Sequence, residues 1–122
     1  MSYDIRFGVE TLHANNFGEH FAIIDRPRFD SPTYNLSEMF RACMDWDFEV
    51  GVWYPYDVFM PAIERGIHEL TVNEDHYIRY NPINGWGSLE NAREVLKSCR
   101  DAITNDFGMT VTWPVEYIWM RW

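Results

Sequence analysis

The chain has 122 residues, of which 47% are apolar and 17% aromatic, with six tryptophans. Its formal net charge of −9 disfavours direct binding to nucleic acid or to an anionic membrane surface, because both repel an acidic protein. No apolar run is long enough to span a bilayer, and the N-terminus has no signal-peptide pattern. We therefore expect a cytoplasmic protein with a single domain over residues 1–122.

The first 25 residues have the pattern of a β-hairpin. Apolar and polar residues alternate over residues 3–9, as in a strand with one buried face. Residues 15–18, Asn-Asn-Phe-Gly, have the composition of a turn, and the apolar run 21–24 predicts the second strand. The two prolines within residues 26–32 then predict a loop.

A first helix is expected to open at Asn35. The Asn35 side chain can accept a hydrogen bond from a free backbone amide, and Glu38, three residues later, completes the pattern of a capping box. The apolar residues that follow recur with the helical period and form one stripe: Leu36, Met39, Phe40, Cys43 and Met44. This stripe predicts a helix that packs on the core along one face.

Two further segments, residues 58–70 and 88–104, have the apolar period of helices. Pro61 is expected in the first turn of the earlier helix, where its missing N–H costs little, and Gly66 should weaken that helix by about 1 kcal/mol relative to alanine. Ser88 is the expected N-cap of the later helix. The inward positions of the two helices are Phe59, Ala62, Ile63, Ile67, Leu70, Leu89, Ala92, Val95, Leu96, Cys99, Ala102 and Ile103.

The remaining segments have weaker patterns. Residues 48–53 fit a short strand or an extended loop, and the polar segment 71–87 is irregular, with a short strand possible at 77–80. Residues 111–119 alternate as a last strand, which Pro114 should place at a sheet edge or at a bulge. The order of strands, helices and strand predicts an α+β fold, with an antiparallel sheet packed on one face by about three helices.

Two expectations about packing follow from these patterns. The helix at 88–104 should face a sheet that contains residues 3–9 and 115–119. Residues 117–122 carry apolar groups on both faces of the last strand, which predicts a homodimer or higher oligomer formed through them. The alternative is that helices cover one face of this strand and loops cover the other.

Motifs of catalysis and metal binding are absent from the sequence. The histidine and cysteine spacings match no zinc site, and there is no nucleophile elbow, Walker loop or dinucleotide fingerprint. Cys43 and Cys99 fall on apolar helical positions and predict buried, reduced thiols. We expect no metal, no cofactor and no enzyme activity; the weaker alternative is an enzyme with His68 or His76 as its base.

One group of residues suggests an anion site. Arg26, Arg28, Tyr34, Asn35 and Arg41 span the proline-containing loop and the start of the first helix. The free N–H groups of a helix N-terminus attract anions, and adjacent arginines would add charge-assisted hydrogen bonds to a phosphate. The alternative is that Asn35 is only a helix cap and that the loop arginines are only solvated.

A second group consists of aromatic residues, most of which lie in irregular segments. Trp53 and Trp86 are the candidate ligand-binding members, because loop aromatics can stack on a nucleobase. The neighbouring aromatic residues are Tyr54, Tyr56, Tyr77 and Tyr80. These rings can equally cover the core or form a dimer interface.

Several short pieces carry a resemblance that extends over nearly the whole chain. They are Met1-Ser-Tyr-Asp-Ile5, Thr33-Tyr34-Asn35, Pro61-Ala-Ile63 with Ile67 and Leu70, Asn91-Ala92 with Val95-Leu96, and Ile118-Trp119. With them the chain resembles a family of small proteins encoded by bacteriophages and mobile elements, mainly of Gram-positive bacteria. That family has a glycine-rich stretch before its Tyr-Asn pair, where this chain has residues 26–32. The resemblance implies an accessory protein of a phage or prophage, but no particular activity.

Two functions are consistent with these observations. The first is an anti-defence protein in the host cytoplasm that sequesters a small anionic ligand, such as a nucleotide immune signal, with the arginines and aromatic rings named above. The second is an inhibitor that binds a host defence nuclease, such as a CRISPR effector, through an acidic surface.

Overall fold

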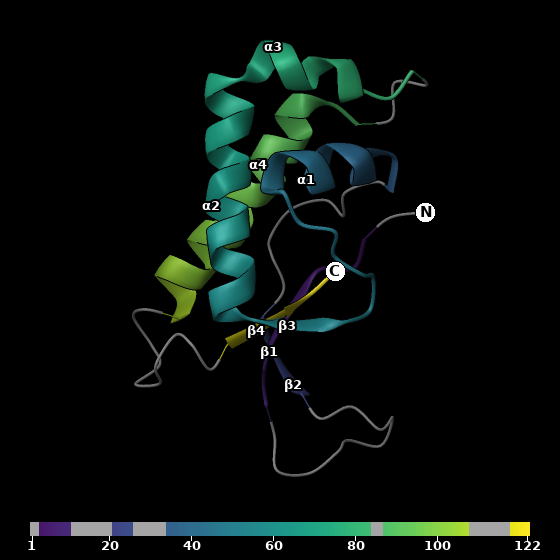
Figure 1. Cartoon of the computed structure of the whole chain (residues 1–122). Coiled ribbons are helices and arrows are strands. Elements are labelled where there is room, and N and C mark those ends of the chain that lie inside the picture. Colours follow the sequence, from purple (N-terminus) through teal and green to yellow (C-terminus); the bar gives the residue numbers. More distant parts are fainter. Residues whose placement is uncertain (1–2, 11–20, 26–33, 84–86, 108–117) are drawn as a thin grey trace.

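The computed structural model describes residues 3–10, 21–25, 34–83, 87–107 and 118–122. The strands lie together at one end of the molecule, and the helices rise from one face of the sheet, with α3 at the opposite end (Figure 1). The elements are β1 (Arg6–Glu10), β2 (Phe21–Asp25), a 3-10 turn (Tyr34–Leu36), α1 (Ser37–Met44), β3 (Trp53–Pro55), α2 (Tyr56–Val72), α3 (Glu74–Tyr77), a second 3-10 turn (Ile78–Tyr80), α4 (Leu89–Asp101), a π-helical turn (Ala102–Phe107) and β4 (Ile118–Arg121). The predicted α+β class, with helices on one face of an antiparallel sheet, is confirmed.

The four strands have the order β2-β1-β4-β3, and every neighbouring pair is antiparallel. The expected hairpin is present as β1 and β2, with a register irregularity between Phe7 and Gly8. Tyr3, Ile5 and Phe7 are buried, as their alternation predicts. The turn at 15–18 and the loop at 26–32 lie outside the described residues.

The described part of the last strand, β4, is in the interior of the sheet and not at its edge as expected, while the alternative of a bulge at Pro114 lies outside the described residues. β4 pairs with β1 on one side and with β3 on the other, and Pro114, the basis of that expectation, lies outside the described part. Met120 and Trp122 are buried on the helix side. They therefore do not form the exposed apolar face from which self-association was expected, and the oligomer remains a prediction.

The edge strand next to β4 is β3, which begins where the segment 48–53 was expected to end. Its last residue, Pro55, has no N–H to donate, so an edge is where a sheet tolerates it. Pro55 has extended backbone dihedrals and leads directly into α2. This short connection fixes the position of α2 against the sheet.

The apolar stripe of the first helix is confirmed, but the predicted cap is wrong. Asn35 lies exposed within the 3-10 turn, α1 begins at Ser37, and its N-cap position is Leu36, which makes no side-chain capping bond. Short-range backbone bonds of a 3-10 turn can satisfy the amides that a capping side chain would otherwise bind. Ser37 instead shares a hydrogen bond with the Tyr3 hydroxyl, which ties α1 to the start of the chain.

The second helix begins earlier than its apolar pattern suggests. α2 starts at Tyr56, so Pro61 is inside the helix and not in its first turn. The proline removes one backbone bond, to the carbonyl of Asp57, on an exposed side of the helix. Asp57 lies in the first turn, where a negative charge stabilises the helix dipole and favours the earlier start.

Residues 77–80 are helical, so the possible strand there is wrong. Glu74 and Asp75 stand in the first turn of α3, and the Tyr77 amide bonds back to the Asn73 carbonyl. Tyr77 is buried and its hydroxyl donates to the Glu69 carboxylate at 3.3 Å. Burial of this ring against α2 outweighs its preference for a strand.

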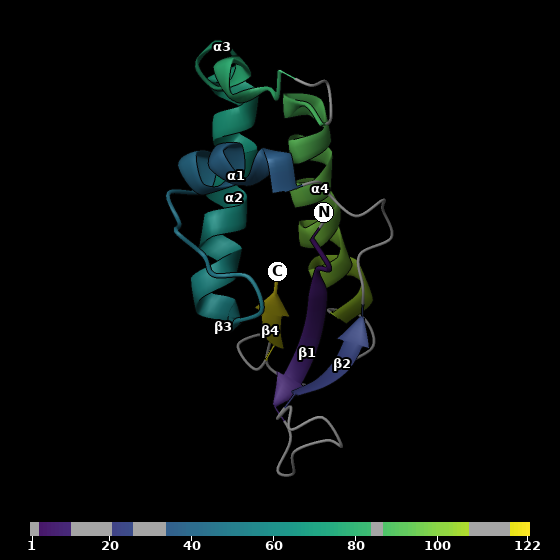
Figure 2. The same ribbon diagram turned by 90° about the vertical axis from the view of Figure 1, so that its right-hand side faces the viewer.

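The clearest sequence pattern gives the best match between prediction and structure. Ser88 caps α4 by accepting a hydrogen bond from the Asn91 amide at 3.2 Å. The predicted inward residues Leu89, Ala92, Val95, Leu96, Cys99 and Ile103 are all buried. Their main packing partner is α2, which runs beside α4 (Figure 2), and not the sheet as expected.

Candidate functional site

The face of the sheet turned away from the helices carries the candidate site. On the helix side, Phe7, Met120 and Tyr54 stand opposite one another on β1, β4 and β3. Because side chains alternate along a strand, the residues next to them point to the other face. We call this the outer sheet face and define it by Arg6, Gly8, Trp53, Pro55, Trp119 and Arg121.

One cross-strand row on the outer sheet face is cationic. Arg6 stands opposite Arg121, and Arg121 stands opposite Trp53. Directly opposed residues on antiparallel strands have Cα atoms about 4.5–5.5 Å apart, so the two arginine side chains leave the sheet at neighbouring positions on the same face. The Arg121 guanidinium lies 5.7 Å from the centroid of the Trp53 ring, within cation–π range.

This row is electrostatically unfavourable by itself, because like charges directly opposite one another destabilise a sheet. Two contacts reduce the cost. The Trp53 ring faces Arg121, and the exposed Asp4 carboxylate accepts a hydrogen bond from Nη2 of Arg6. A bound anion between the arginines would reduce this repulsion further.

The neighbouring row carries one large side chain. Gly8 stands opposite Trp119, and Trp119 stands opposite Pro55. Gly8 and Pro55 have small or compact side chains, so the Trp119 indole is the dominant group of this row. Trp119 is partly exposed, and its ring can stack on a planar ligand. The two rows are separated by two residues along a strand, which is about 6.7 Å.

The guanidinium group of Arg6 has one N–H group, at Nε, without an acceptor among the described residues. Its side chain is 21% exposed, but its Nε atom is buried and has no hydrogen-bond partner among the described residues. Buried polar atoms in native proteins are nearly always hydrogen-bonded. Arg6 therefore holds one N–H for an acceptor that the described residues do not supply.

The residues predicted from sequence are dispersed in the structure. Arg26, Arg28 and Trp86 lie outside the described residues, and of Tyr34 only the backbone is described. Asn35 is exposed on the turn before α1. Of the predicted residues that the structure describes, only Trp53 lies on the outer sheet face.

Arg41 has a structural position. Its Nε and Nη2 donate to the Phe48 carbonyl at 3.3 and 3.0 Å, and its guanidinium lies 4.5 Å from the Phe48 ring centroid. It also forms an ion pair with the exposed Asp47 at 3.4 Å. Arg41 thus holds the segment after α1 against the core, instead of reaching across a ligand site.

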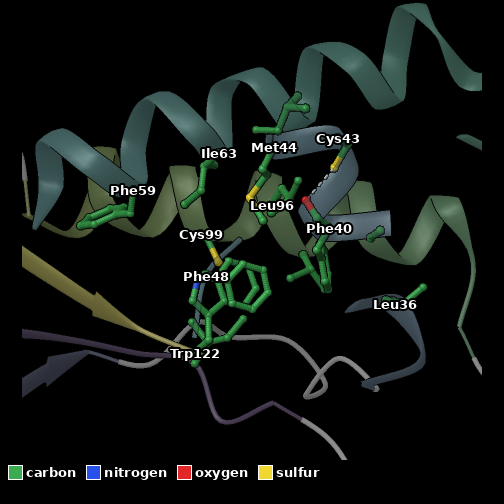
Figure 3. Close-up of a cluster of buried hydrophobic side chains, with 14 of the residues drawn as sticks. Leu36, Phe40, Cys43, Met44, Phe48, Phe59, Ile63, Leu96, Cys99 and Trp122 are labelled. Carbon is green, nitrogen blue, oxygen red and sulfur yellow. Dashed lines mark hydrogen bonds between the residues drawn. The ribbon is translucent and has the colours of Figure 1, made fainter. Parts of the chain in front are cut away.

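The other aromatic residues considered from sequence are mostly part of the core or border it. Tyr56 packs edge-on against the buried Phe59 with centroids 5.6 Å apart, and Phe59 belongs to the cluster shown in Figure 3. Tyr54 packs edge-on against Trp46 at 4.8 Å, and Tyr80 stacks on the buried Tyr77 at 6.1 Å. For these rings, the interpretation that they cover the core is the correct one.

Sequence reasoning missed Arg6, Trp119 and Arg121. The alternation of residues 3–9 places Arg6 on the polar face, and that of the last strand places Trp119 and Arg121 on one side. The missing information was the pairing of β1 with β4, which joins the two ends of the chain.

The pKa values of Cys43, Cys99 and Glu69 are shifted by burial or by hydrogen bonds. Burial raises the pKa of the Cys43 thiol to about 12 and also raises that of Cys99, so both thiols stay protonated at neutral pH. The pKa of Glu69 is lowered, chiefly by its hydrogen bond from Asn73 and also by Tyr77. Within the described ranges, no three histidine, cysteine or acidic side chains are grouped closely enough to hold a metal ion.

The sequence matches no family model, and it has no match among curated proteins or solved structures. No described helix combines the length and the apolar character needed to cross a bilayer. The outer sheet face is therefore the feature from which a function can be inferred.

Proposed function

We propose that the protein binds a small anionic ligand with a planar ring, of the nucleotide class, on the outer sheet face. The observation that carries this proposal is the row Arg6–Arg121–Trp53 across three strands. Paired guanidinium groups form charge-assisted, bidentate hydrogen bonds to phosphate oxygens, and a tryptophan ring can stack on a base. The guanidinium groups and the tryptophan rings both lie in the two adjacent cross-strand rows of the outer sheet face.

The charge of the whole chain favours a small ligand over a nucleic acid. With a net charge of −9, the protein repels an extended polyanion along most of its length. A mononucleotide-sized ligand needs favourable contact only with Arg6 and Arg121. The site therefore supports sequestration of a small molecule.

We further propose that this binding serves an accessory protein of a phage or prophage, which would hold a nucleotide immune signal in the host cytoplasm without degrading it. The resemblance in sequence supports this setting. The exposed His68 and His76 lie on α2 and α3 and not on the outer sheet face, which favours a binding protein over an enzyme.

Titration calorimetry with AMP, ADP-ribose and cyclic di-AMP at low ionic strength tests the proposal. At least one nucleotide should bind, and Arg121→Gln should weaken its binding roughly tenfold to hundredfold, because a charged hydrogen-bond partner is lost. The matched control is Arg79→Gln, which removes the same charge at an exposed position of the Ile78–Tyr80 turn, near α3 and far from the sheet (Figure 1).

Equal binding by the Arg121 variant and the wild type would place the ligand elsewhere and refute this site. Failure of all three nucleotides to bind, together with capture of a host nuclease by the tagged protein, would refute ligand sequestration. That outcome would favour the alternative of a nuclease inhibitor.

A further inference from the structure

We infer that the outer sheet face selects a terminal phosphate monoester over a phosphate diester. This inference rests on the proposed function and specifies its ligand class. It follows from three features of the cationic row: the carboxylate already bound to Arg6, the spacing of the two arginines, and the buried Nε of Arg6.

The first feature is a competitor within the protein. Asp4 and Arg6 are two residues apart, on the same side of the extended N-terminal segment, and the Asp4 carboxylate holds Nη2 of Arg6. An incoming anion must displace this carboxylate or share the guanidinium with it. A diester carries a single negative charge, like the carboxylate, whereas a monoester carries about −1.5 to −2 at pH 7. The monoester therefore competes better.

The second feature is the number of ligand oxygen atoms that can accept hydrogen bonds from Arg6 and Arg121. Arg6 and Arg121 stand opposite one another on β1 and β4, so the donors of both side chains are within reach of one phosphate. A terminal phosphate has three strong acceptor oxygens. If two of them accept hydrogen bonds from the two guanidinium groups, the third oxygen still needs a donor. The Nε of Arg6 is buried and has no acceptor among the described residues, so it becomes a donor for this third oxygen when the Arg6 side chain turns from Asp4 toward the phosphate. A diester has substituents where this oxygen would be.

The overall charge of the protein acts in the opposite direction but more weakly. A net charge of −9 repels a dianion more than a monoanion. Solvent-exposed charges are screened over about 8 Å at physiological ionic strength. Direct contact with two partly buried guanidinium groups is screened much less, so the local attraction determines the preference.

The test compares AMP with 3′,5′-cyclic AMP, which has the same base and ribose but a diester phosphate. Calorimetry on the wild-type protein should show AMP binding at least roughly tenfold more tightly. Asp4→Asn removes the competing charge, so it should strengthen binding of both ligands and narrow the difference between them. Asp75→Asn, which removes an exposed charge on α3, is the matched control and should change neither affinity.

The outcomes separate the inference from the proposed function. Binding of cyclic AMP as tightly as AMP, with both lost in Arg121→Gln, would overturn the selectivity and keep the nucleotide site. No binding of either ligand would overturn the selectivity inferred here, while binding of ADP-ribose or cyclic di-AMP would still support the site. An unchanged ratio in Asp4→Asn would overturn the role of Asp4 as the competitor.

Discussion

Gly66 shows how one residue can be required for packing although it weakens its own helix. A Cβ atom at this position would lie 2.7 Å from Cδ1 of Leu96, 2.8 Å from Cγ of Met44 and 3.3 Å from Sγ of Cys43. These side chains come from α4 and α1, and Figure 3 shows Met44 and Leu96 beside one another. The absence of a side chain is therefore what lets the three helices meet.

We predict that Gly66→Ala destabilises the protein. Alanine contributes about 1 kcal/mol of helix propensity, but overpacking a tight core usually costs 1–3 kcal/mol, so the expected net loss is roughly 0–2 kcal/mol. Urea unfolding measures it, with His68→Ala at an exposed position of the same helix as the control. A variant more stable than wild type would show that the helices separate easily.

Arg41 allows a structural role to be distinguished from a role in binding. Arg41→Met keeps the apolar stem but removes two hydrogen bonds to the Phe48 carbonyl, so stability should fall by about 1–3 kcal/mol. Nucleotide affinity should be unchanged. Loss of affinity in a variant that calorimetry shows to be fully folded would return Arg41 to the ligand site.

At the scale of the element, α4 depends on its N-cap. The Ser88 hydroxyl satisfies the Asn91 amide, one of the free N–H groups at the start of the helix. Ser88→Ala should cost about 1 kcal/mol, whereas Ser88→Gly should cost only a few tenths. Urea unfolding of both variants measures the difference, and equal stability of all three proteins would show that the cap contributes nothing.

At the scale of the whole molecule, the two buried thiols link stability to pH. The pKa of Cys43 is about 12 in the folded protein against an ordinary value of 9.0, and that of Cys99 is also raised. Both thiols favour the folded state in full below pH 9, and this contribution is lost as pH rises from about 9 to 12, because only the unfolded chain releases these protons. Unfolding free energy should therefore fall over this range.

Cys43→Ala isolates this effect. The variant loses stability at every pH because a buried side chain is removed, but its stability should fall less steeply than that of wild type above pH 9. Urea unfolding at several pH values gives the two slopes. Parallel slopes would show that Cys43 titrates in the folded protein as it does in the unfolded chain.

The elements with a strong local pattern were predictable. Ser88 and the apolar stripe of α4 describe a helix whose backbone bonds all lie within the segment itself. The pairing of β1 with β2 joins consecutive strands of the chain, so it was also predictable. The Asn35 cap and the strand at 77–80 were wrong because a 3-10 turn and the burial of Tyr77 replaced the local preferences.

The sequence by itself determined the α+β class, the faces of the helices and the buried thiols, because burial periodicity and capping act over a few neighbouring residues. Only the tertiary structure decided the candidate site. Arg6 and Arg121 lie at opposite ends of the chain and become neighbours when β4 inserts between β1 and β3. Strand order and register depend on how the whole core packs, so no local pattern encodes that Arg6, Arg121 and Trp53 share one row.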